Sequence, residues 1–215
     1  HIFVFLVIGR PPGSALCPYT TLFRTDLIAI LRDNVRERDQ VIGDFHSLAV
    51  CNATGMRRLK GMLAEFELRD LEDLAGFIFE NSQRATRERI AALPDGTQRY
   101  AMTVDGYEKP IELVVAVEIA ADKLRADFAG TSDPSRYGIN VPLTYTKAYA
   151  SYALKCAIAP EIPNNWGSLE PFEISAPEDC ILNAHRPRPV SVRHVIGHLI
   201  PDVVLGALQP ICQGE

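Results

Sequence analysis

The chain has 215 residues, of which 47% are hydrophobic and 23% charged, and its formal net charge is −5. This is the composition of a globular protein of one or two domains with a substantial core. The acidic balance, without a basic run, argues against nucleic acid as a partner. Five scattered cysteines with no C-x-x-C pair argue against a disulfide framework or a zinc knuckle, and they predict free thiols in the cytoplasm.

The first 24 residues are expected to be foreign to the rest of the chain. The apolar run at residues 1–8 is too short to span a membrane and lacks the basic flank of a signal peptide, so no membrane is expected as a partner. Residues 14–24 resemble a translated sequencing adapter. We therefore expect residues 1–24 to be a non-native scar and residues 25–215 to be a partial domain, an internal fragment of a larger protein.

Residues 26–93 are predicted to be helical, because their apolar side chains recur at steps of three and four residues. Gly55 is expected to mark either a break in this apolar stripe or a close approach of another segment. Pro94, Asp95 and Gly96 are expected to end it, since proline and a following glycine are typical of a helix end. Arg84, Arg87 and Arg89 belong to a charged run near that end and predict a solvated helix face.

The hydrophobic period then changes from 3.6 to 2 residues. Apolar and polar residues alternate over 100–104, 111–119 and 124–128, which predicts an antiparallel β-meander with one wet face. The elements expected after it are a helix over 145–159 with Ala148, Tyr149, Tyr152, Ala153 and Cys156 facing inward, short strands at 172–175 and 180–182, and a helix over 195–208. The predicted class is α+β: an N-terminal helical segment, an antiparallel β-meander, then mixed α/β elements.

Polar side chains gather in the loops after the meander and after the helix over 145–159. Asp127 ends a strand, Thr131 adds a hydroxyl after a turn at Gly130, and Asn140 and Asn165 lie in the loops that follow. Such residues bind small polar ligands, but they also cap turns by bonding to nearby backbone groups. Spacing alone favours the caps. A binding role requires that these loops fold together into one polar cleft.

Two other pairs of polar residues are candidates for a site. Asp44 and His46 flank Phe45 on a helix and diverge by about 100° to either side, which is typical of boundary residues. His194 and His198 have the i, i+4 spacing that can place two imidazoles on one metal ion. No H-E-x-x-H pattern accompanies them, and His194 falls at an expected helix start, so a helix-start or interface role is favoured.

The sequence contains no motif that would hold a nucleotide or a serine nucleophile. It has no G-x-x-x-x-G-K-[ST], no G-x-G-x-x-G after a strand and no G-x-S-x-G. If ATP takes part in the reaction, this segment does not hold it by a known loop.

Several short motifs, in their order and spacing over residues 26–213, resemble the B component of the hydantoinase/oxoprolinase family. They include Gly43-Asp44-Phe45-His46, Asp127-Phe128-Ala129-Gly130-Thr131, Ile162-Pro163-Asn164-Asn165-Trp166-Gly167, Ala176-Pro177-Glu178-Asp179 and Pro201-Asp202-Val203-Val204-Leu205-Gly206-Ala207. The chain departs from the family where Asp179-Cys180 replaces the common Gly-Ser, and where His194 and His198 replace small polar residues. These departures bear on the substrate more than on the fold.

The resemblance implies an ATP-dependent enzyme that opens a cyclic amide of the hydantoin or 5-oxoproline type. ATP would be held by a hydantoinase A-type subunit or domain. A divalent metal is implied for the carboxylase branch, with ligands upstream of this segment, so no metal ligand is expected here. The isolated piece is expected to be inactive.

The resemblance also implies roles for individual side chains. Asp127 would act as a general base or orient water or a metal. The residues that would line the substrate pocket are Thr131, Asn140 and Asn165. Those that would lie next to it are Asp44, His46, His194 and His198.

Two alternative functions of the chain remain open at this point. The first is the B-type subunit of an acetone or acetophenone carboxylase. The second is a segment without catalytic residues that only builds the subunit interface, with Arg84, Arg87 and Arg89 docking the A-type partner.

Overall fold

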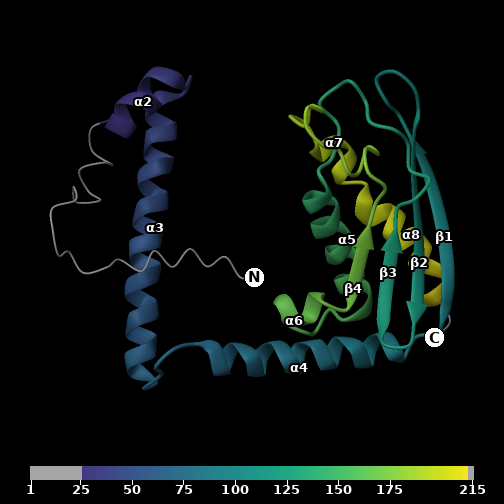
Figure 1. Cartoon of the computed structure of the whole chain (residues 1–215), viewed down its shortest axis with the longest axis horizontal. Helices are drawn as coiled ribbons and strands as arrows, with labels where there is room; N and C mark the ends of the chain where they lie inside the picture. Colours follow the sequence, from purple (N-terminus) through teal and green to yellow (C-terminus); the bar gives the residue numbers. More distant parts are fainter. Residues whose placement is uncertain (1–25, 213–215) are drawn as a thin grey trace. The chain divides into compact units, whose positions relative to one another are not determined.

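The structure, a computed structural model, describes residues 26–212, which form two compact units that divide after Asp70. The first unit contains α2 (Asp26–Asn34) and α3 (Arg38–Glu65). The second contains α4 (Glu72–Ala91), β1 (Gly96–Val104), β2 (Ile111–Ala120), β3 (Lys123–Asp127), α5 (Leu143–Ile158), α6 (Trp166–Leu169), β4 (Phe172–Ser175), α7 (His194–Gly197) and α8 (Ile200–Cys212). Figure 1 shows these elements. The predicted α+β class is confirmed, and the expected scar at residues 1–24 lies outside the described residues.

The first unit consists of α2 packed against α3. Ile42 is the buried side chain of α3. The predicted break at Gly55 is wrong, because α3 continues through it. A Cβ atom built at Gly55 would have no neighbour within 4 Å, so the residue marks no close approach. A glycine inside a helix costs about 1 kcal/mol relative to alanine, which a helix of 28 residues tolerates.

The second unit is built on a four-stranded sheet with the order β1-β2-β3-β4. The first three strands are antiparallel neighbours, as predicted for a meander. β4 adds to β3 in parallel, so the sheet is mixed. The strand predicted at 180–182 is wrong. Ile181 lies in a buried loop that donates its N–H to Ser132 O and accepts from Val141 N, instead of joining the sheet.

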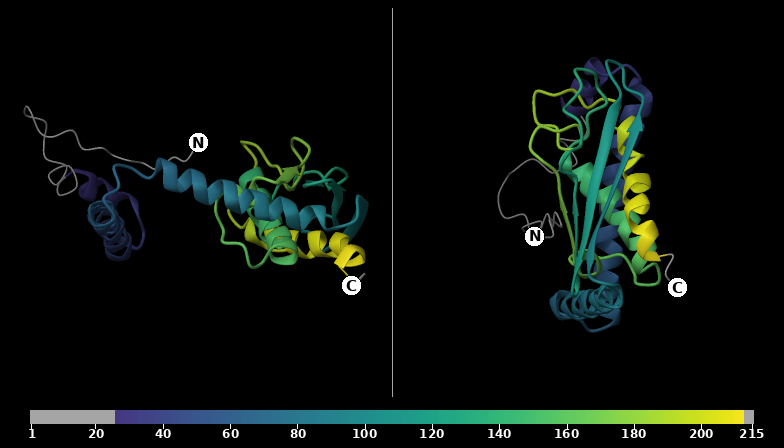
Figure 2. Two further views of the ribbon diagram at one scale, coloured as in Figure 1. Left: turned by 90° about the horizontal axis from the view of Figure 1, so that it is seen from below. Right: turned by 90° about the vertical axis from the view of Figure 1, so that its right-hand side faces the viewer.

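Helices α5 and α8 cover one face of the sheet, as Figures 1 and 2 show. The core between them contains alternate residues of β2 and one side of α8, namely Leu113, Val115, Val117, Ile119, Val203, Val204, Ala207 and Leu208. Burial of these apolar side chains is the dominant force that holds the helices on the sheet. The opposite face carries the polar residues of the strands, in agreement with the predicted wet face.

Helix α4 runs past the ends of the strands at one edge of this unit (Figure 1), and α6 packs against it. The two helices approach so closely that a Cβ atom built at Gly167 would lie 2.0 Å from Phe79 O. Glycine is therefore required at that position of α6. This contact fixes the loop that contains Asn165 at the α4 end of the unit.

The inward face predicted for α5 is wrong in part. Ala153 is buried and Tyr149 half-buried, but Tyr152 is 62% exposed, and Ala148 and Cys156 are also exposed. The buried side chains are Thr146, Ala150, Ala153, Leu154 and Lys155. The buried face of α5 is therefore rotated around the helix axis relative to the predicted one. Tyr149, Tyr152 and Cys156 lie at the edge of this face instead of inside it.

The predicted last helix is interrupted after α7. Residues 194–211 are long and apolar enough to cross a membrane by composition. In this unit, however, Ile196, Ile200 and Leu208 are packed into the core against the sheet. The same composition is typical of the core helix of a globular domain, which is what the packing shows.

Candidate functional site

Asp127 stands at the end of β3, level with Ser175 on the parallel strand β4. Its Oδ1 accepts hydrogen bonds from Ser175 Oγ at 3.1 Å and from Ala129 N at 3.2 Å. Within residues 26–212, Oδ2 makes no hydrogen bond. The carboxylate is half-buried. It is thus held by one oxygen and presents the other, which suits a group that accepts a proton or orients a ligand.

Thr131 is buried, and its hydroxyl is used by the neighbouring strand. Oγ1 accepts from Val114 N at 3.0 Å and donates to Val114 O at 3.1 Å. These two bonds dock the loop after β3 onto β2, where the ladder with β3 has ended. The side chain therefore completes the backbone hydrogen bonding of Val114.

Asn140 is fully buried and organises two loops. Its Oδ1 accepts from Ser135 N at 2.7 Å, and its Nδ2 lies 2.8–2.9 Å from the carbonyl oxygens of Ser135, Tyr137 and Pro189. The amide consequently ties the loop over 133–140 to the segment around Pro189. No donor hydrogen of the side chain is left over for a substrate.

Asn165 is the N-cap of α6. Its Oδ1 accepts from Ser168 N at 3.1 Å, while Ser168 Oγ in turn accepts from Asn165 N, which completes a capping box. Its Nδ2 donates to Ser82 Oγ on α4 at 2.8 Å. Asn165 thus joins α6 to α4.

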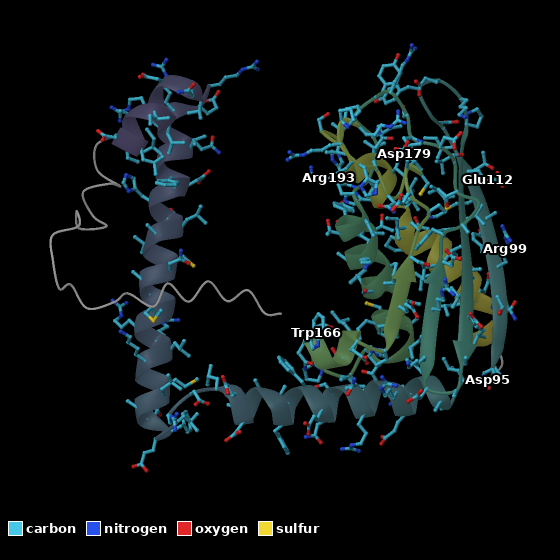
Figure 3. The ribbon with its side chains drawn as sticks, in the orientation of Figure 1. Asp95, Arg99, Glu112, Trp166, Asp179 and Arg193 are labelled. Atoms are coloured by element: carbon cyan, nitrogen blue, oxygen red, sulfur yellow. The ribbon has the colours of Figure 1, made fainter. Side chains whose placement is uncertain are left out.

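The four candidate residues do not share one cleft. The loops of Asp127, Thr131 and Asn140 lie at one end of the sheet, where Ile181 links Ser132 to Val141 through backbone hydrogen bonds. Asn165 lies at the other end, because α6 leads directly into the start of β4, next to Leu124. Leu124 and Asp127 are three residues apart in β3, or about 10 Å. Figure 3 shows the same separation, with Trp166 beside α4 and Asp179 and Arg193 at the opposite end.

The other candidates are divided between the two units. Asp44 and His46 lie on the exposed side of α3 in the first unit. His194 and His198 lie at α7 in the second, exposed, with ring centres 5.8 Å apart. Within residues 26–212, no group of three or more His, Cys, Asp or Glu side chains is arranged to hold a metal ion.

A hollow on the outer side of α5 was not indicated by any sequence pattern. This open hollow has a volume of 750 Å³ and is lined by α5, the loop 160–164 and Leu169. Lys155 forms part of its wall but is only 5% exposed. Its Nζ donates to Ala159 O and, at 2.5 Å, to Ile162 O. Burial lowers the pKa of the ammonium, although Glu161 partly opposes this.

The arginines of α4 are engaged within the chain. Arg87 pairs with Asp122 at 2.8 Å and with Glu170 at 2.9 Å, and its hydrogen bond lowers the pKa of Asp122. Arg89 pairs with Glu161, and Arg84 with Glu88 one turn along the helix. Arg87 and Arg89 hold α4 to the rest of the second unit, so they are already used by the fold.

Comparison with known proteins identifies the family to which the sequence belongs. The model of the family described as "Hydantoinase B/oxoprolinase" matches residues 18–215. The chain belongs to the hydantoinase B/oxoprolinase family. A protein of Pseudomonas sp. (strain NS671), named as the B component of a D-/L-hydantoinase, is 26% identical over 85% of this chain and 33% of its own length. The 5-oxoprolinase 1 of Arabidopsis thaliana is 27% identical over 78% of this chain and 14% of its own.

Two solved structures share the fold. The ATP-dependent caprolactamase from Pseudomonas jessenii matches 87% of this chain and 33% of its own, with a TM-score of 0.79 at 20% identity. A nucleotide-free acetone carboxylase matches 62% of this chain and 20% of its own, with a TM-score of 0.55 at 18% identity. The chain therefore spans a third or less of the length of these relatives.

Proposed function

We propose that this chain is part of the B component of an ATP-dependent hydrolase that opens a cyclic amide. The family match over residues 18–215 carries this proposal. The fold agrees better with the caprolactamase than with the acetone carboxylase, by TM-score (0.79 against 0.55) and by the share of this chain that is matched. Together with the names of the hydantoinase and 5-oxoprolinase relatives, these values favour ring opening over ketone carboxylation.

In this proposal Asp127 is the residue that meets the substrate. Its Oδ2, which makes no hydrogen bond within residues 26–212, accepts a proton from the attacking water and returns it to the ring nitrogen as the C–N bond breaks, while Ser175 and the backbone N–H of Ala129 hold Oδ1. ATP, held by an A-type partner, supplies the activation of the amide carbonyl. A fixed carboxylate beside an activated carbonyl is what hydrolysis of an unreactive amide requires.

Thr131 and Asn140 serve the site by fixing its loops rather than by touching the substrate. Their hydrogen bonds to Val114, Ser135 and Pro189 set the path of the chain on either side of Asp127. Asn165 holds α6 to α4 through its hydrogen bond to Ser82. We further propose a cytoplasmic setting, which the free thiols of the described cysteines Cys51, Cys156 and Cys180 support.

Product analysis of the full-length complex tests the reaction class. The complex, assembled with its A-type partner, is incubated with ATP and a set of lactams and cyclic imides, and separately with ketones and bicarbonate. The proposal predicts an amino acid from a lactam and a half-amide acid from a cyclic imide, in each case together with ADP and phosphate. Carboxylated ketone without ring opening would instead establish the carboxylase alternative, which the match to acetone carboxylase keeps open.

The interface alternative makes a different prediction. Arg84, Arg87 and Arg89 are all paired within the chain, so their replacement should affect stability before it affects partner binding. Co-purification of the A-type partner with an Arg84→Ala variant, whose ion pair is the most exposed of the three, separates the two effects. Loss of the partner with an unchanged melting temperature would support docking through this helix face.

A further inference from the structure

His194 and His198 form a pair that the proposed hydrolase reaction does not use. Their ring centres are 5.8 Å apart, and the planes are inclined by 52°. Both side chains are exposed. Within residues 26–212, neither imidazole lies within ion-pair distance of a carboxylate. The two rings are therefore close, accessible and not engaged by an acid.

The packing of α5 fixes one of these rings in advance. The His198 ring stacks on Tyr149 at 5.5 Å, and Tyr149 stacks on Tyr145 at 4.4 Å. The tyrosine pair reaches its place because a Cβ atom at Gly197 would lie 2.3 Å from Tyr145 Cε1, so only glycine fits there. The guanidinium of Arg193 lies 5.9 Å from the Tyr145 ring centre. Little side-chain freedom is thus lost if His198 binds a ligand.

The spacing of the rings matches coordination of one metal ion by two imidazoles. A zinc–nitrogen bond is about 2.0–2.1 Å. Adding about 1.1 Å from the nitrogen to the ring centre, a tetrahedral angle places two ligating imidazole centres about 5.2 Å apart. The observed 5.8 Å is reached from there by a small rotation of the exposed His194 side chain.

We propose that His194 and His198 bind a divalent transition metal ion, with Zn²⁺ as the probe metal. Imidazole nitrogen is a preferred ligand of this ion. Two protein ligands leave further coordination positions, which water can take. The site is separate from Asp127, and the inference does not depend on the proposed reaction.

Calorimetric titration of Zn²⁺ into the whole chain tests the proposal. His1 carries a further imidazole, so every titration uses a His1→Ala background. We expect one Zn²⁺ bound, with affinity reduced at least tenfold by His194→Ala and by His198→Ala. Acidification should weaken binding, because protons compete for the same nitrogens.

Matched controls use the two other histidines of the chain. His46→Ala and His185→Ala remove exposed imidazoles elsewhere and should leave the affinity unchanged. Far-UV circular dichroism checks that each variant is folded, and His194→Gln repeats the test with a side chain of similar size. Binding that survives the double change of His194 and His198, or a background chain that binds no Zn²⁺, would overturn the proposal.

Discussion

The loops at the Asp127 end of the sheet and the short helix α7 use their polar groups in opposite ways. In the loops, the hydroxyl of Thr131 and the amide of Asn140 are occupied by backbone partners. At α7, the exposed imidazoles of His194 and His198 have no carboxylate within ion-pair distance in the part of the chain that the structure describes. A loop rich in amides and hydroxyls is therefore not by itself a binding site. Groups such as Asp127 Oδ2, for which the described residues provide no hydrogen-bond partner, are the better candidates.

Replacement of Asn140 should have the largest effect on stability. Asn140→Ala leaves the buried Ser135 N–H and several carbonyl groups without partners, and we expect a loss of about 3 kcal/mol in the free energy of unfolding. Urea unfolding followed by the fluorescence of Trp166, the one tryptophan of the sequence, measures it.

Asn165→Ala is the matched control for this change. It removes an N-cap on a four-residue helix and should cost about 1 kcal/mol. Suppose instead that the Asn140→Ala variant is as stable as the parent but does not bind substrate. Asn140 would then be a substrate-binding residue and not a residue that stabilises the loops.

Arg87→Ala should have an intermediate effect. The guanidinium is partly exposed and joins α4 to Asp122 and Glu170, so its loss should cost at most about 1 kcal/mol, more than Arg84→Ala. The folded pKa of Asp122 lies below its ordinary 3.8, so the parent keeps this stabilisation at neutral pH and loses it as the pH falls through the lowered pKa. Melting temperatures of parent and variant should therefore converge in acid.

Lys155 should produce the smallest effect, with a pH dependence of the same sign as that of Asp122 but in the alkaline range. Its folded pKa is lowered from 10.5, so between the folded pKa and 10.5 the unfolded chain binds more protons than the native one. The contribution of Lys155 to stability therefore rises with pH across that window. Lys155→Met, which has no proton to release, should lack this rise when melting temperatures are compared on alkaline titration. An identical rise in both chains would show that Lys155 is not the cause.

Local patterns predicted the parts of the fold that depend on neighbours in sequence. The alternation over β1, β2 and β3 was enough for the meander, because each strand pairs with the next. The parallel pairing of β4 with β3 was not predictable, since residues far apart in the chain form it. The apolar residues around Ile181 predicted a strand because they are buried. The backbone of Ile181, however, forms hydrogen bonds with the loop residues Ser132 and Val141 and not with a strand of the sheet.

For the candidate site, too, local sequence indicated single residues but not the contacts between distant parts of the chain. Asp127 was predicted as a candidate because a carboxylate ends a strand, and the structure confirms that it lies at the end of β3. The role of Asn140 depends on Pro189, 49 residues away, and that of Lys155 on how the turn at 159–162 presents its carbonyl groups. The His194 and His198 pair was visible as i, i+4 spacing, but the tyrosine stack that orients it required the packing of α5 against α7.

Asp127→Asn in the full-length complex tests the central claim most directly. The amide keeps the shape of the side chain and can still accept from Ser175, but its second position can no longer take a proton. ATP-coupled ring opening is measured beside a Thr131→Ser control that retains the hydroxyl. The account predicts a fall in kcat of at least a hundredfold for Asp127→Asn, with unchanged assembly and melting temperature. Turnover equal to that of the parent would contradict it.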